Sequence, residues 1–132
     1  MLTKKFLPIA ASILGMITLL SSPPASAEMV KVGENSDGTV YFLDTDTMMK
    51  RDEDFGTVIK VYAPLSKADY FSQYSLKPAC GDERLFLVGS RLIYDGRVIE
   101  TTKLKEETRV RNGSPFSNAM TYYCKSIGAR GW

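Results

Sequence analysis

The sequence predicts an α+β fold, in which an antiparallel β-sheet has a C-terminal helix packed on it. Runs rich in β-branched and aromatic residues, such as 39–43 and 57–63, are separated by short charged or glycine-containing turns. No helical pattern of about 10–15 residues lies between these runs, which favours antiparallel pairing over alternating strands and helices. The one clear helical pattern follows Ser114 and Pro115, close to the C-terminal end.

Residues 1–27 are typical of a cleaved secretory signal peptide. Lys4 and Lys5 precede a mostly apolar run at 6–20, and Ala25-Ser26-Ala27 matches a small-x-small cleavage site. The apolar run is shorter than the roughly 20 residues that a spanning helix needs, and it has no cysteine for lipid attachment. We therefore expect one exported domain, residues 28–132, without a stable membrane anchor. It would lie in the periplasm, at the cell surface or outside the cell.

The charge of the exported domain bears on its partner. The chain has 17 Lys and Arg against 15 Asp and Glu, so removal of Lys4 and Lys5 leaves the domain formally neutral. Nucleic acids and anionic membranes are bound through concentrated positive charge. We expect neither as the main partner.

The first half of the domain is predicted to be strands joined by polar turns. We expect strands at 29–32, 39–43 and 57–63, the last ending at Pro64, and a solvated charged loop tip at 50–54. Asp44 and Asp46 follow the second strand. An EF-hand calcium loop starting at Asp44 would need an oxygen ligand, a glycine and a glutamate where this chain has Met48, Met49 and Phe55. These carboxylates are therefore assigned to turn formation.

Residues 66–75 form a polar stretch that contains three aromatic side chains: Tyr70, Phe71 and Tyr74. If the stretch forms a helical turn, Tyr70 and Tyr74 share one face. Two interpretations stay open for the three aromatics, namely packing over the sheet and contact with another protein. They are the candidate protein-binding residues.

The central feature of the sequence is a hairpin around Asp95 and Gly96, because Asp-Gly between β-prone runs is a strong signal for a two-residue turn. A regular ladder from this turn pairs Tyr94 with Arg97, Ile93 with Val98, Leu92 with Ile99 and Arg91 with Glu100. A pairing of Arg91 with Ile99 or Thr101 would contradict this interpretation of the turn.

The C-terminal part is predicted to hold an edge element and the helix. Residues 103–111 are strongly charged and fit an edge strand or a solvated connection; a homodimer through such a sheet edge is one further expectation. The helix begins with Ser114 as N-cap and Pro115, and runs to about Lys125. Its apolar side holds residues at helical spacing: Phe116, Ala119, Met120, Tyr123 and Cys124.

The two cysteines, Cys80 and Cys124, are predicted to form a disulfide, since an exported chain with an even cysteine count favours one. The chain has no histidine, so Ser-His and Cys-His nucleophiles and histidine metal sites are excluded. No phosphate-binding or dinucleotide-binding glycine motif occurs. We expect no catalytic residues, no metal and no cofactor, and hence no enzyme. Carboxylate pairs are the one catalytic arrangement that the composition still permits.

Several short stretches resemble the surface-adhesin E-like family of small exported bacterial domains. They are residues 41–48 (YFLDTDTM), 57–63, Cys80 followed by Arg84, residues 94–99 (YDGRVI), and Ser114 to Cys124. The resemblance covers about Val30 to Lys125 and implies an antiparallel sheet, a packed helix and a disulfide. It also implies adhesion to host or extracellular proteins. The chain departs from the family pattern in having its sole tryptophan at Trp132 rather than after the hairpin.

Three functional hypotheses follow. The first is an exported non-enzymatic protein-binding domain, similar to the surface-adhesin E proteins. The second is a periplasmic inhibitor or accessory subunit of an envelope enzyme. The third is a small carboxylate-dependent enzyme.

Overall fold

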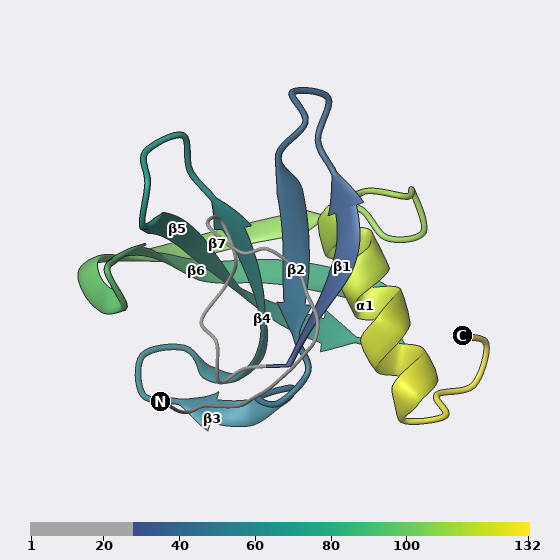
Figure 1. Ribbon diagram of the computed structural model, residues 1–132. Helices are drawn as coiled ribbons and strands as arrows, with labels where there is room; N and C mark the ends of the chain where they lie inside the picture. Colours follow the sequence, from purple (N-terminus) through teal and green to yellow (C-terminus); the bar gives the residue numbers. More distant parts are fainter. Residues whose placement is uncertain (1–27) are drawn as a thin grey trace, which may run out of the picture.

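The computed structural model describes residues 28–132; the signal peptide predicted at 1–27 lies outside this range. The described residues form seven strands and one helix (Figure 1). They are β1 (Met29–Glu34), β2 (Val40–Asp44), β3 (Lys50–Asp52), β4 (Gly56–Pro64), β5 (Tyr70–Ala79), β6 (Arg84–Tyr94), β7 (Arg97–Thr108) and α1 (Pro115–Ser126).

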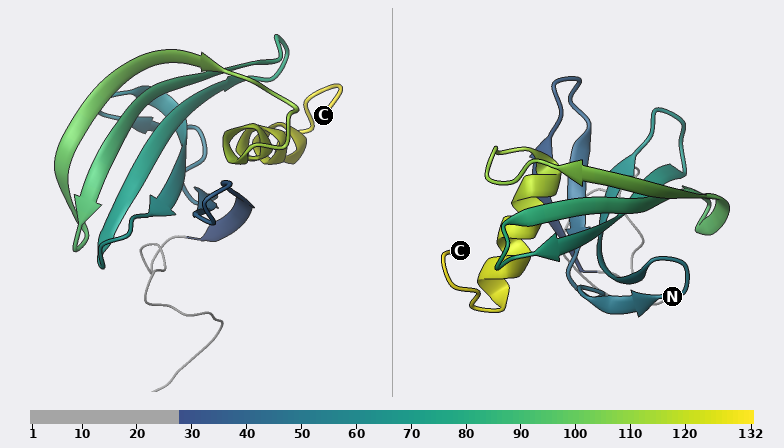
Figure 2. Two further views of the ribbon diagram at one scale, coloured as in Figure 1. Left: turned by 90° about the horizontal axis from the view of Figure 1, so that it is seen from above. Right: turned by 180° about the vertical axis from the view of Figure 1, so that it is seen from behind.

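The strands form one antiparallel sheet in the order β1-β2-β4-β5-β6-β7, and β3 pairs with β4 outside this path. The sheet is strongly curved, and α1 lies on its concave side near β1 (Figure 2). The predicted α+β architecture is therefore confirmed. β7 is an edge strand whose side chains are mostly exposed, as its charged composition suggested.

The main core lies between the sheet and the helix. Its buried residues are Val32, Leu43, Ile59, Val61, Leu76, Leu85, Leu87, Ala119, Met120 and Cys124. The helix begins where predicted, because Ser114 Oγ accepts a hydrogen bond from Ser117 N at 3.3 Å and Pro115 occupies the first turn. Asn118 Nδ2 donates to Val32 O at 2.7 Å and fixes the helix against β1.

The β6–β7 hairpin has the predicted two-residue turn, with positive φ at Asp95 and Gly96. Tyr94 pairs with Arg97 and Ile93 with Val98, as expected. Beyond these pairs the predicted register is wrong: Leu92 lies opposite Glu100, and Arg91 lies opposite Thr101. The cause is a β-bulge, in which Ile99 is an extra residue in β7.

Two other sequence expectations need correction. The aromatic stretch at 66–75 is not a helical turn, because Tyr70 begins the ten-residue strand β5. The charged stretch at 50–54 is not simply a solvated tip. It forms β3 and a turn that folds back over the sheet, and Asp52 is buried within it. The carboxylate of Asp52 is stabilised there by Arg91, which is distant in the sequence.

Candidate protein-binding surface at the hairpin tips

The loop between β4 and β5 and the turn between β6 and β7 are joined at one end of the sheet. Asp95 N donates to Asp69 O at 3.0 Å, and Leu65 N donates to Tyr70 O at 2.9 Å. Apolar and aromatic side chains gather around this junction. We call them the tip surface, which consists of Leu65, Tyr70, Phe71, Tyr94, Val98 and Ile99.

The tip surface holds most of the exposed large apolar side chains of the described residues. Val98 and Ile99 are each 52% exposed, Leu65 is 41% exposed and Tyr94 is 36% exposed. The other two such residues, Tyr122 and Ile127, lie in and just after α1. Exposed apolar side chains are unremarkable singly, but a cluster of them on one part of a surface is typical of an interaction site.

The aromatic residues of the tip surface are held by strand pairing. Tyr70 and Tyr94 lie directly opposite each other on β5 and β6, and their ring centroids are 4.5 Å apart. Lys67 Nζ lies 5.8 Å from the centroid of the Tyr70 ring. Because both tyrosines belong to paired strands, their rings offer a large contact area with little conformational entropy left to lose on binding.

The other face of the tip surface is aliphatic and aromatic. Phe71, Ile93 and Val98 lie side by side across β5, β6 and β7. Residues next to each other along a strand point to opposite faces, so this row lies opposite the tyrosine pair. Ile93 is buried, so Phe71 and Val98 are the apolar side chains of this row that are accessible at the sheet end.

A hollow of about 240 Å³ lies beside the tyrosine pair, within the loop from Pro64 to Phe71. Lys67 and Asp69 both line it, together with the Tyr70 side chain. A hollow of this size, with one cation and one anion at its walls, can receive a single side chain of a partner protein.

The structure brings together two of the three aromatics singled out in the sequence. Tyr70 and Phe71 lie in the tip surface and are half-buried. Tyr74 lies further along β5, half-buried in an aromatic cluster with Tyr41 and Phe116, whose ring centroids are 6.2 and 5.1 Å from its own. Packing accounts for the position of Tyr74.

Sequence reasoning missed Leu65, Tyr94, Val98 and Ile99. Tyr94, Val98 and Ile99 belong to the predicted hairpin, where a regular ladder pairs apolar with apolar residues and so suggests burial. Their exposure depends on the position of β7 at the sheet edge and on the bulge at Ile99. The Asp95-Gly96 turn was the sequence signal that could have indicated the exposure of these residues, since it placed them at a hairpin tip.

A buried ionic cluster lies next to the tip surface, on the sheet face that points away from α1. Arg91 NH1 and NH2 donate to the two carboxylate oxygens of Asp52 at 2.9 and 2.7 Å. Arg91 also donates to Gln73 Oε1 at 2.9 Å and to Asp54 Oδ2 at 2.6 Å. Lys60 Nζ lies 3.0 Å from Asp52 Oδ1. The cluster thus ties β3, β4, β5 and β6 together.

Electrostatics within this cluster favour the ionised forms. The hydrogen bonds from Arg91 hold the pKa of Asp52 well below its usual range, with a smaller lowering by Lys60, against the opposing effect of burial. The same contact with Asp52 raises the pKa of Arg91. Burial raises the pKa of Tyr62, whose hydroxyl accepts a hydrogen bond from Gln73 Nε2 at 2.7 Å. Asp52 and Arg91 are therefore paired with each other in their ionised forms.

Phe55 covers the cluster on its outer side. The Arg91 guanidinium lies 4.7 Å from the centroid of the Phe55 ring. Phe55 also lies directly on Gly89, where a Cβ atom would come within 2.1 Å of Phe55 Cε1. A side chain at residue 89 would therefore displace the aromatic ring. The residues of this cluster form a rigid base from which the tips of β5 and β6 extend.

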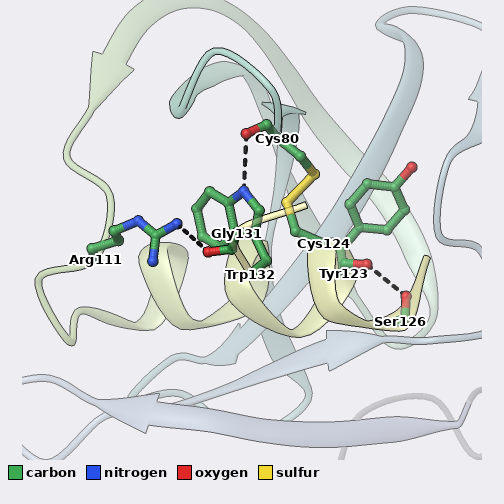
Figure 3. The surroundings of a disulfide bond; sticks show 7 residues. All are labelled: Cys80, Arg111, Tyr123, Cys124, Ser126, Gly131 and Trp132. Atoms are coloured by element: carbon green, nitrogen blue, oxygen red, sulfur yellow. Dashed lines mark hydrogen bonds between the residues drawn. A yellow bond between two sulfur atoms is a disulfide. The ribbon is translucent and has the colours of Figure 1, made fainter. Parts of the chain in front are cut away.

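The disulfide holds the other end of β5 to the helix (Figure 3). Cys80 and Cys124 are bonded as predicted, with their Cα atoms 5.8 Å apart. Trp132 Nε1 donates to Cys80 O at 2.9 Å. The Arg111 guanidinium lies 3.9 Å from the centroid of the Trp132 ring and donates to Gly131 O at 2.8 Å. The C-terminal segment is thus packed beside the disulfide.

Asp44 and Asp46 serve local backbone contacts. Asp44 Oδ1 accepts from Asp46 N at 3.0 Å, and Asp46 Oδ2 accepts from Glu28 N at 3.0 Å. Within residues 28–132, no three Cys, Asp or Glu side chains lie together in a way that would hold a metal ion. No helix in the same range is long and apolar enough to cross a membrane. Comparison of the chain with known protein families, curated proteins and solved structures yields no match.

Proposed function

We propose that this protein is an exported, non-enzymatic domain that binds another protein through the tip surface. The observation that carries the proposal is the gathering of Leu65, Tyr94, Val98 and Ile99, all exposed, at one end of the sheet. Covering such exposed apolar side chains with a partner removes them from water, which is favourable. The tyrosine pair adds one of the side-chain types that are enriched at the energetic centres of interfaces.

The proposal includes the resemblance to the surface-adhesin E-like proteins. Its support is a set of short sequence similarities and an architecture of the kind that they imply, with an antiparallel sheet, a C-terminal helix and one disulfide. On this basis we propose an extracellular protein as the partner. An envelope protein of the producing cell is the alternative, and the experiment below separates the two.

The test is binding of the purified protein, immobilised through an exposed lysine, to two sets of candidates. One set is a panel of purified extracellular-matrix proteins, and the other is a detergent-free extract of the bacterial envelope. We expect saturable binding to at least one matrix protein. Binding confined to an envelope protein would reject the adhesin-like form of the proposal, and saturable binding to neither set would reject the whole proposal.

The surface is tested with Tyr94→Ser and Val98→Ser, with Tyr122→Ser as the matched control. Tyr122 is 41% exposed and lies on α1, so its loss removes a similar exposed aromatic from another surface. We expect each tip variant to weaken binding by roughly tenfold, the effect of a residue worth somewhat more than 1 kcal/mol. Equal weakening by Tyr122→Ser would place the contact elsewhere.

The positions of Tyr70 and Tyr74 give a second check. Tyr74→Ser should lower the free energy of unfolding by about 2 kcal/mol, because the ring packs against two others. Tyr70→Ser should lower it by less and should weaken binding. If Tyr70→Ser is the more destabilising of the two and leaves binding intact, Tyr70 is a packing residue and not part of the contact surface.

A further inference from the structure

A second concave surface lies far from the tip surface, at the other end of β7. It is a cavity of about 310 Å³ between the β1–β2 turn, the end of β7 and the first turn of α1. We call it the helix-start pocket. The lining residues that decide its chemistry are Asn35, Tyr41, Arg109, Asn112, Ser114 and Phe116.

One wall of the helix-start pocket is aromatic and firmly supported. The rings of Tyr41 and Phe116 meet edge to face, with centroids 5.9 Å apart and an angle of 88° between their planes. Tyr74 lies behind both rings, in contact with each. A flat apolar group entering the pocket therefore meets a preformed aromatic surface.

The polar groups of the pocket are oriented as donors. Asn35 Nδ2 donates to the Tyr41 hydroxyl oxygen at 2.8 Å, so the hydrogen of that hydroxyl stays available for another acceptor. Asn112 Oδ1 already accepts from Ser114 N at 3.0 Å, which leaves the Asn112 amide group as a donor. The Tyr41 hydroxyl and the Asn112 amide therefore each have a hydrogen available for a ligand.

The charge of the pocket is positive. Arg109 lines the pocket, and within residues 28–132 its guanidinium forms no ion pair. No lining residue carries a carboxylate. The nearby acid, Asp37, belongs to the β1–β2 turn and accepts from Thr39 N at 3.0 Å. A ligand cation would find no counter-charge among the lining residues, whereas an anion would find Arg109.

We infer that the helix-start pocket binds a small carboxylate carried on an aromatic ring. The ring lies against Tyr41 and Phe116, and the carboxylate accepts hydrogen bonds from Arg109 and Asn112. Liquid water takes about 30 Å³ per molecule, so the volume suits a ligand of roughly ten non-hydrogen atoms. A free aromatic acid and the C-terminal aromatic residue of a peptide share this chemistry.

The test is an NMR titration of the ¹⁵N-labelled protein with three probes that share one ring: phenylacetate, phenylacetamide and phenethylamine. We expect phenylacetate to shift the amide signals of Asn112, Ser114 and Phe116 saturably, with a Kd of roughly millimolar order for so small a ligand. The neutral amide should bind at least tenfold more weakly, and the cation should not shift these signals. Gly-Gly-Phe with a free C-terminal carboxylate and its C-terminally amidated form are titrated as a further pair. If the free form binds as well as phenylacetate and the amidated form does not, the C-terminus of a peptide is a source of the ligand.

Arg109→Gln and the matched control Arg97→Gln test the role of the charge. Both residues are exposed and lie at opposite ends of β7, so neither change should alter the melting temperature. Arg109→Gln should reduce phenylacetate affinity to that of phenylacetamide, and Arg97→Gln should leave it unchanged. The inference is overturned if acetate alone reproduces the shifts, if the acid and the amide bind equally, or if Arg109→Gln has no effect.

Discussion

The buried pair between Asp52 and Arg91 allows a quantitative test of what holds the sheet face together. The side chains of Asp52 and Arg91 are only 6% and 8% exposed. Asp52 accepts two hydrogen bonds from Arg91 and one each from the backbone N–H groups of Asp54 and Phe55. Asp52→Ala removes all four at once and leaves the guanidinium buried with Asp54 and Gln73.

We expect Asp52→Ala to lower the free energy of unfolding by about 3–5 kcal/mol, the usual cost of breaking a buried ion pair from one side. For a domain of this size, each kcal/mol changes Tm by roughly 4–8 °C, so Tm should fall by about 12 °C or more. Urea unfolding and thermal melts followed by circular dichroism at pH 7 measure both quantities. Glu107→Gln is the control, because the Arg84–Glu107 pair is 54% and 48% exposed and its loss should leave Tm nearly unchanged.

The double variant Asp52→Leu with Arg91→Met separates the cost of losing one partner from the worth of the pair. Replacing both partners also removes the buried guanidinium, which the single change leaves without its buried carboxylate partner, so the double variant should be more stable than Asp52→Ala. If Asp52→Ala costs less than about 1 kcal/mol at pH 7, the cluster does not brace the sheet and the reasoning is refuted.

The pH dependence of stability follows from the lowered pKa of Asp52. The folded-state pKa lies below the value of about 3.9 expected in the unfolded chain. The stabilisation by this carboxylate is therefore fully present at pH values above the unfolded-state pKa, and it is lost as pH falls through the folded-state pKa. The stability difference between the wild type and Asp52→Asn should shrink from pH 7 to pH 3, measured by urea unfolding. A constant difference over this range would mean that the Asp52 charge contributes nothing.

Two further predictions concern other supports of the fold. The Cys80–Cys124 disulfide closes a loop of sequence separation 44, so Cys80→Ser with Cys124→Ser should cost up to about 4 kcal/mol, and intact mass without reductant should show no free thiol in the wild type. Gly89→Ala should destabilise the protein by about 1–3 kcal/mol, because its Cβ would overlap Phe55, whereas Gly81→Ala meets no atom within 4 Å and should be tolerated in the same thermal melt.

The features that could be predicted from the sequence are those with local signals. The helix begins at the Ser114-Pro115 pair because capping and a fixed φ act within one turn, and the structure places its first residue there. Strand β4 follows its run of β-branched residues and contains Pro64 at its end. The disulfide followed from the even cysteine count together with the predicted export of the chain.

Strand β5 was missed because its sequence contains features that oppose a central strand. It is polar near its start and contains Pro78, which cannot donate to a ladder. In the structure the ladder between β5 and β4 is shorter than the ladder between β5 and β6, and this accommodates Pro78. β4 pairs with β5 only from Phe71 to Leu76, so Pro78 lies beyond that ladder and pairs on one side, with Leu85 of β6. Because Pro78 has no partner in β4, its missing N–H leaves no hydrogen bond of the β4–β5 ladder unmade.

The register of the β6–β7 hairpin departs from the regular ladder at a position that lies next to both the buried cluster and the candidate surface. A regular ladder would set Arg91 opposite Glu100, an exposed pair worth at most about 1 kcal/mol. In the structure Arg91 instead forms hydrogen bonds with Asp52, Asp54 and Gln73, and those to Asp52 and Gln73 are buried. A buried charge-assisted hydrogen bond is stronger than an exposed ion pair.

Asp52 lies 39 residues from Arg91 in the sequence, so no local pattern reveals this contact. The bulge at Ile99 shifts Glu100 away from Arg91 and toward solvent, where β7 forms the sheet edge. The same bulge leaves Val98 and Ile99 exposed at the end of the sheet that also holds the tyrosine pair. If the bulge is a requirement of the tip surface, deletion of Ile99 should give a ladder without a bulge, in which Glu100 stays opposite Leu92, and should abolish partner binding, while the Asp52–Arg91 contact persists. Retention of binding by the deletion variant would show that the bulge serves the fold alone.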